Sequence, residues 1–148
     1  MYMADVQSIR FNINKISTDE FAMTEEKYDP AIPAEIKIGL GFNFARDDRI
    51  IVVQVKCMFY QQDKLLIVIA VSCWFMVDPE DWQKIYLQEN KTFELSLPIA
   101  LHLASLTVGT ARGVLHAKTE KHILNAVLIP PVNLNEIIKE GLKIPVNE

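Results

Sequence analysis

The sequence is poor in the residue types that build chemical centres. It contains two cysteines and three histidines among 148 residues. Cys57 and Cys73 both lie inside apolar, strand-like runs, where small core hydrophobes are expected rather than a disulfide framework. The histidines have no recognised ligand spacing: His102, His116 and His122. We therefore predict no metal site, no cofactor and no disulfide.

Long apolar runs and an excess of positive charge are also missing. The longest apolar stretch, Leu65–Val77, is shorter than the roughly 20 residues that a membrane helix needs, and Lys64 and Asp78 bound it. The net charge is −4 and the pI is near 5.4, which removes the electrostatic case for nucleic acid or an anionic membrane. We see no signal peptide. The sequence therefore predicts a cytoplasmic protein that does not insert into membranes.

No group of residues has the arrangement of a catalytic centre. No serine lies in a nucleophile-elbow motif, and Gly39–Gly41 lacks the rest of a dinucleotide fingerprint. The acidic pairs Asp47-Asp48 and Glu25-Glu26 fall in polar turns, which is typical of solvated charge. We predict that the protein is not an enzyme.

The sequence does contain enough apolar residues for one folded domain, residues 1–148. Half of its residues are hydrophobic, and a chain of this length buries roughly 70% of the surface that its unfolded form exposes. A two-residue hydrophobic period predicts four strands, with short polar turns between the last three. They are expected at Ile9–Asn14, Ile36–Ala45, Ile50–Tyr60 and Leu65–Val77. The short turns indicate an antiparallel meander.

Helical patterns follow the strands. A short helix is expected after the fourth strand, and a long helix of about twenty residues begins near Pro98, which is tolerated in a first turn. Pro130-Pro131 then forces an extended segment. Asn133 and Glu136 have the spacing of a capping box for a short final helix that ends near Gly141. The fold class is therefore α+β.

Small residues form a stripe on the long helix. Ser105, Gly109 and Gly113 are four residues apart, so they share one face. Each interior glycine costs roughly 1 kcal/mol relative to alanine, and close approach of another backbone is the usual compensation. We interpret the stripe as a packing surface, either against a second subunit or against the chain's own sheet.

The last two strands are apolar on both faces. The second face carries these residues: Val52, Met58, Tyr60, Leu66, Val68, Ala70, Trp74 and Met76. One layer of helix covers only one face of a sheet, so a second apolar face on an antiparallel sheet indicates another subunit or a ligand. A dimer interface is the simpler explanation, and substrate binding is the alternative.

A long connection, Ile16–Glu35, separates the first two expected strands. It is too long for a hairpin and rich in acidic residues, and loops of that length are often functional. Its large apolar residues are Phe21, Met23 and Tyr28. They either pin the loop to the sheet or line a groove that binds an apolar peptide.

The order of these elements resembles the SecB family of export chaperones. Three motifs are similar to that family: Pro98 at the start of the long helix, Arg112-Gly113 within it, and Pro131–Leu134 before the last helix. Phe21 lies where the family has a phenylalanine after its first strand. The resemblance implies a four-stranded antiparallel sheet with a long crossover after the first strand, a long helix and a short C-terminal helix.

The resemblance also implies a function. SecB-like proteins are ATP-independent holdases that bind extended apolar segments of unfolded or nascent polypeptides, and they assemble as tetramers from two dimers. Two departures bear on the partner. About nine additional residues near His116–Asn125 follow the Arg-Gly pair, and the polar C-terminal tail that SecB uses to contact the translocase motor SecA is missing. Both departures are more similar to divergent SecB-like proteins, some of which are chaperones of antitoxins in toxin–antitoxin systems.

Overall fold

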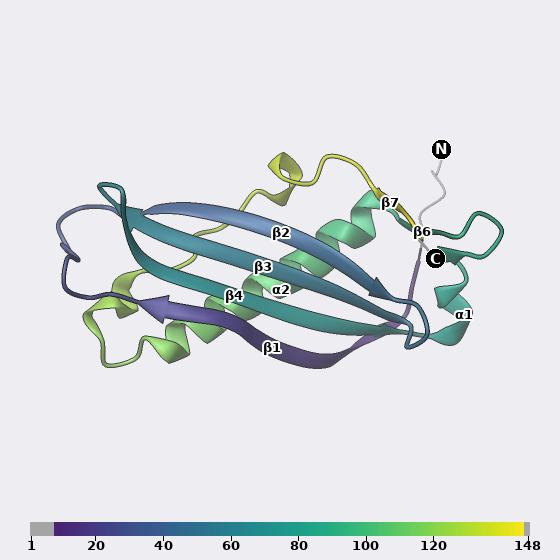
Figure 1. Cartoon of the computed structure of the whole chain (residues 1–148), viewed down its shortest axis with the longest axis horizontal. Helices are drawn as coiled ribbons and strands as arrows, with labels where there is room; N and C mark the ends of the chain where they lie inside the picture. The colour runs from purple at the N-terminus through teal and green to yellow at the C-terminus, as the bar shows by residue number, and fades with distance from the viewer. Residues whose placement is uncertain (1–7, 147–148) are drawn as a thin grey trace, which may run out of the picture.

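A computed structural model describes residues 8–146, and a twisted antiparallel sheet is its main element (Figure 1). The sheet contains four strands: β1 (Phe11–Met23), β2 (Glu35–Ala45), β3 (Ile50–Gln61) and β4 (Lys64–Val77). Their spatial order is β1-β4-β3-β2, and every neighbouring pair is antiparallel. The chain therefore crosses from one edge of the sheet to the other between β1 and β2, which confirms the predicted crossover and meander.

Strand β1 is longer than the sequence predicts. It runs through Met23, so the expectation that the crossover begins at Ile16 is wrong. Two register shifts, between Ile13 and Lys15 and between Thr18 and Glu20, interrupt its pairing with β4. Each irregularity moves the following side chains out of strict alternation, so the sequence of β1 does not show a regular two-residue hydrophobic period. The true crossover is the connection 24–34.

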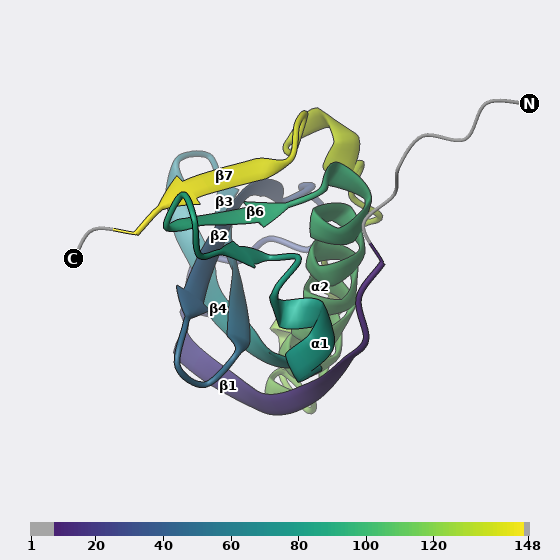
Figure 2. The same ribbon diagram turned by 90° about the vertical axis from the view of Figure 1, so that its right-hand side faces the viewer.

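Helix α2 (Leu97–Lys118) covers one face of this sheet (Figure 2). It packs on β3 and β4, and the predicted long helix is confirmed. Its sheet-facing residues are buried: Ile99, Ala100, Leu103, Ala104, Thr107, Val108, Ala111 and Leu115. Pro98 lies in the first turn, where its missing N–H costs no helical hydrogen bond.

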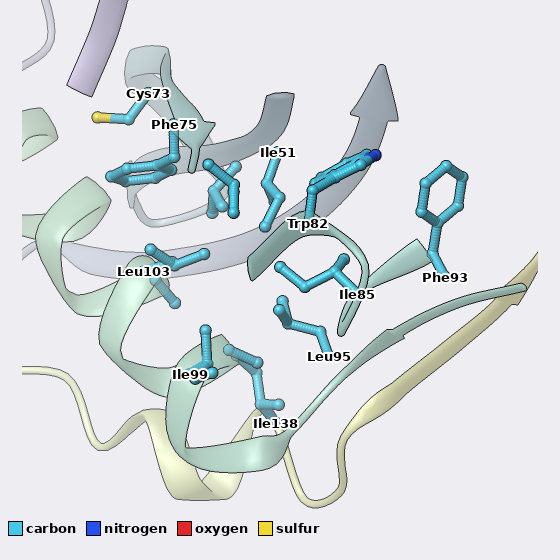
Figure 3. Packing of buried hydrophobic residues seen from close by; sticks show 14 residues of the cluster. Ile51, Cys73, Phe75, Trp82, Ile85, Phe93, Leu95, Ile99, Leu103 and Ile138 are labelled. Atoms are coloured by element: carbon cyan, nitrogen blue, oxygen red, sulfur yellow. The ribbon is translucent and has the colours of Figure 1, made fainter. Parts of the chain in front are cut away.

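Two clusters of buried hydrophobic residues lie beneath α2, and one of them is at the start of the helix. Figure 3 shows Phe75 and Ile51 from the sheet and Leu103 from α2 gathered in one cluster. Trp82, at the end of the short helix α1 (Pro79–Trp82), belongs to the same cluster, and Phe93 lies beside it with the two ring centroids 5.8 Å apart. Asp78 caps α1, as expected, by accepting a hydrogen bond from the N–H of Glu80.

A second, smaller sheet packs beside the start of α2. It consists of β5 (Tyr86–Leu87), β6 (Thr92–Leu95) and β7 (Leu142–Pro145) in that order. The expected C-terminal helix is reduced to the 3₁₀ turn η2 (Leu134–Glu136), after which the chain becomes strand β7. Asn133 caps this turn by accepting from the N–H of Asn135, and the reciprocal bond of a capping box is not formed. The local capping signal is real, but pairing with β6 takes the following residues into a strand.

The face of the main sheet away from α2 carries a polar row. Its centre is Asp19, which accepts hydrogen bonds from Ser17, Gln54 and Ser72. Burial acts to raise the pKa of Asp19, but these hydrogen bonds hold it below its usual value. Leu66, which was expected on this face, instead lies in the core beneath α2, because the register of β3 and β4 shifts near it.

Both thiols are buried in the sheet and remain free. Burial raises the pKa of Cys57 to about 11, partly offset by the positive charge of Arg112. Within residues 8–146, no cluster of three or more potential metal-ligating side chains occurs. The helices of the same range are all too short or too polar to cross a membrane.

Candidate peptide-binding groove

A groove of about 430 Å³, lined by uncharged residues, opens beside the edge of β2. One wall is the crossover between β1 and β2, and the other is the segment that follows the 3₁₀ turn η1 (Ile123–Ala126). Figure 1 shows the crossover and the turn after α2 at the same end of the sheet. The groove is lined without a single charged residue by Tyr28, Pro30, Ile32, Pro33, Ala34, Ile36, Phe59, Ala126, Val127, Leu128 and Pro130. Such a lining suits apolar side chains.

The crossover wall is irregular backbone held by one side chain of β3. The Gln61 side chain accepts a hydrogen bond from the Asp29 N–H at 3.0 Å, and its Nε2 donates to the Asp29 carbonyl at 2.9 Å and to the Ile32 carbonyl at 2.6 Å. Gln61 is only 4% exposed. The amide therefore gives this loop the partners that a neighbouring strand would otherwise supply.

The opposite wall is held by one side chain of α2. Arg112 donates from Nε to the Ile129 carbonyl at 2.7 Å and from Nη2 to the Pro130 carbonyl at 2.9 Å. Val127 and Ile129 are buried, which fixes alternate residues of the wall in the core. Leu128 between them is 55% exposed and faces the groove.

One direct contact ties the two walls together outside the lining. Glu25 of the crossover pairs with His122, which precedes η1, and both side chains are half-exposed. The pair carries little free energy because solvent screens it. It does show that the segments forming the two walls lie close together.

Other hollows suit an apolar ligand less well. One of about 670 Å³ lies between the start of α2 and the approach to β7, and its lining includes Glu94, Glu140 and Lys143. An apolar segment would have to desolvate these charges there. The groove beside β2 has no charged residue in its lining, so we take it as the functional candidate.

The structure separates the three residues predicted for peptide binding. Tyr28 is in the crossover and lines the groove. Phe21 and Met23 lie in β1, not in the loop, and pack against the core beneath α2. The Phe21 ring is also covered by the Lys118 ammonium, 5.4 Å from its centroid.

The small-residue stripe faces away from the sheet. Ser105, Gly109 and Gly113 are exposed on α2, and a Cβ added at either glycine would meet nothing within 4 Å. Packing of the stripe against the chain's own sheet, one of the two alternatives from the sequence, is therefore wrong. Packing against a second subunit stays a prediction.

Sequence reasoning missed the wall at 126–130 and both residues that hold the walls. Residues 127–133 have neither helical nor strand backbone, so no hydrophobic period marks them. The available signal was Leu128, an apolar residue that lies shortly before Pro130-Pro131 and follows Arg112 in the sequence. Arg112 and the proline pair were both recognised as motifs, but nothing in the sequence places them together.

No protein-family model matches the sequence, and no curated protein matches it. Seven chains of solved structures do match. One is the Rv1957 SecB-like chaperone of Mycobacterium tuberculosis, in complex with a ChAD peptide from the Rv1956 HigA1 antitoxin. The match has a TM-score of 0.57 and 13% identity, and covers 83% of this chain and 91% of that chain. The chain therefore has a SecB-like fold, as its motifs predict.

Proposed function

We propose that this protein is a non-enzymatic chaperone that binds extended, apolar segments of other polypeptides in the groove beside β2. The observation that carries the proposal is the uncharged lining of that groove, which includes the outward-facing side chain of Leu128. Leu128 is 55% exposed. A single exposed leucine needs no explanation, but one that lines an uncharged groove supports a binding role.

The groove also suits an extended ligand in its geometry. Strand β2 is an edge strand, so one row of its backbone groups is available beside the groove. An extended segment can pair with such an edge while alternate side chains enter the uncharged lining. Burial of apolar surface and main-chain hydrogen bonds need no nucleotide, so the activity is ATP-independent.

A holdase assay tests this function. A reduced, slowly folding protein is diluted from denaturant with increasing amounts of this chain, and its aggregation is followed by light scattering without ATP. Suppression at about stoichiometric amounts supports the proposal. An unchanged aggregation rate, together with no binding of apolar peptides, would reject it.

The second candidate function is a chaperone for one specific partner. The Rv1957 structure, which shares the fold, contains a peptide of an antitoxin. This supports a partner of the same kind here, in place of general clients or delivery to the translocase motor SecA. Pull-down from the native host distinguishes the two: a specific chaperone retains one stoichiometric partner, and a general holdase retains many.

We further propose that the protein works in the cytoplasm as a homo-oligomer, a tetramer built from two dimers. The exposed stripe of Ser105, Gly109 and Gly113 supports this assembly, because a helix face without bulky side chains allows close approach of another backbone. The polar row around Asp19 argues against using the outer sheet face as the main apolar interface, because its charges would lose water.

A further inference from the structure

We propose that Gln61 and Arg112 are positioning residues that hold the two walls of the groove at the separation its ligand requires. The inference rests on the proposed function, since it assigns these residues a role in the same groove. Neither side chain lines the groove, and each acts on it only through the main chain of a wall.

The two side chains supply hydrogen-bond donors to main-chain carbonyls on opposite walls of the groove. They bond four carbonyls, and each carbonyl belongs to a residue that precedes a proline: Asp29, Ile32, Ile129 and Pro130. A residue before proline is pushed away from helical backbone, and the proline itself has no N–H to donate. Neither wall can therefore join a helix or a regular ladder, and side-chain donors serve its carbonyls. The Asp29 carbonyl also accepts one main-chain hydrogen bond, from the Ile32 N–H at 3.1 Å.

Both donors come from rigid parts of the fold. Gln61 is the last residue of β3, and Arg112 is in α2, which packs on β3 and β4. The sheet thus fixes one wall and the helix fixes the other. Because the proline-rich walls are themselves stiff, two clamps are enough to set the width of the groove in the free protein.

The expected effect on affinity follows from the fraction of molecules in which both walls are in place. If a wall leaves its position for part of the time, the apparent dissociation constant rises by the inverse of the competent fraction. Gln61 supplies three hydrogen bonds to its wall and Arg112 supplies two. Because these bonds keep each wall in its position, removing either side chain should weaken binding by roughly tenfold.

The test compares two variants with two matched controls. Gln61→Met keeps the side-chain length and removes the amide, and Arg112→Gln removes the charge and is too short to replace both guanidinium bonds. Gln54→Met and Arg49→Gln are the controls: Gln54 lies on the same strand but bonds Asp19 on the outer face, and Arg49 donates to a backbone carbonyl, that of Val77, at 3.2 Å. All four variants lose hydrogen bonds, but only the first two touch the walls.

Two readouts are measured on each folded variant. The first is the dissociation constant for a dye-labelled peptide of alternating leucine and serine. The second is amide hydrogen exchange. We expect Gln61→Met to weaken binding about tenfold and to speed amide exchange in residues 24–34 alone. Arg112→Gln should also weaken binding about tenfold, but should speed exchange in residues 119–133 alone. The controls should keep wild-type affinity within about twofold.

Arg112→Lys should restore part of the affinity, because an ammonium can bond one of the two carbonyls but cannot bond both as a planar fork. Affinities equal to those of the controls, or faster exchange spread evenly over the whole chain, would overturn the positioning role. If the wild-type protein binds no apolar peptide, the proposed function fails. Exchange confined to the walls would still establish the clamps.

Discussion

Truncation of Leu128 separates binding from folding more cleanly than any other change in the groove. Its side chain is 55% exposed, so the unliganded fold gains little from its outer atoms. Full burial of a leucine contributes about 1.5–3 kcal/mol. A ligand that covers the exposed half should therefore gain about 1 kcal/mol from this residue, and Leu128→Ala should weaken binding roughly fivefold.

The matched control for this variant is Leu65→Ala. Leu65 is 46% exposed and does not line the groove, so the chemical change and its cost in the free protein are similar. Each leucine is about half buried in the free protein, so both variants should lose about 1 kcal/mol of stability in urea unfolding. Peptide affinity is then measured by fluorescence anisotropy for all three proteins.

Two results would refute this reasoning. Equal affinities of the two variants would mean that the ligand does not cover Leu128. A loss of more than about 2 kcal/mol of stability in Leu128→Ala alone would mean that the residue belongs to the core, since only buried truncations cost that much.

Three further predictions concern stability and assembly. Gly141→Ala should cost about 1–3 kcal/mol in urea unfolding, because its Cβ would lie 2.7 Å from a backbone oxygen of β6; an unchanged midpoint would contradict this close approach. Hydrogen bonds from Lys84 and Arg10 lower the pKa of Asp81, so its stabilisation is complete above the usual aspartate pKa of about 4 and is lost as pH falls below it. The stability difference between wild type and Asp81→Asn should therefore shrink on acidification, and a constant difference would reject the linkage. Gly109→Leu should fold normally, with about 1 kcal/mol more helix stability, but lose oligomer mass in light scattering; unchanged mass would remove the stripe from the interface.

The sequence predicts those elements whose periodicity is long and uninterrupted. Strands β2, β3 and β4 and helix α2 lie within a few residues of their expected bounds. Their long apolar patterns, with a two-residue or helical period, are bounded by polar turns or by proline. The second half of β1 was missed because its bulges break that alternation near Thr18 and because its polar residues, such as Asp19, serve the outer face.

Pairings between distant segments were not predictable in the same way. Strand β7 exists because Leu142–Pro145 lies against β6, far earlier in the chain, and no local signal carries that pairing. The groove is similar: Tyr28 was identified as a candidate from one wall, but the other wall depends on where Arg112 reaches. Motifs in the sequence mark the parts of the site, and only the fold brings the two walls together.

The most direct test of the central claim is a magnetic-resonance titration of the isotope-labelled protein with the leucine–serine peptide. The groove hypothesis predicts chemical-shift changes centred on Tyr28, Ile32 and Leu128, with little change on the outer sheet face. Changes centred on Trp74 and the polar row around Asp19, or no changes at all, would contradict it.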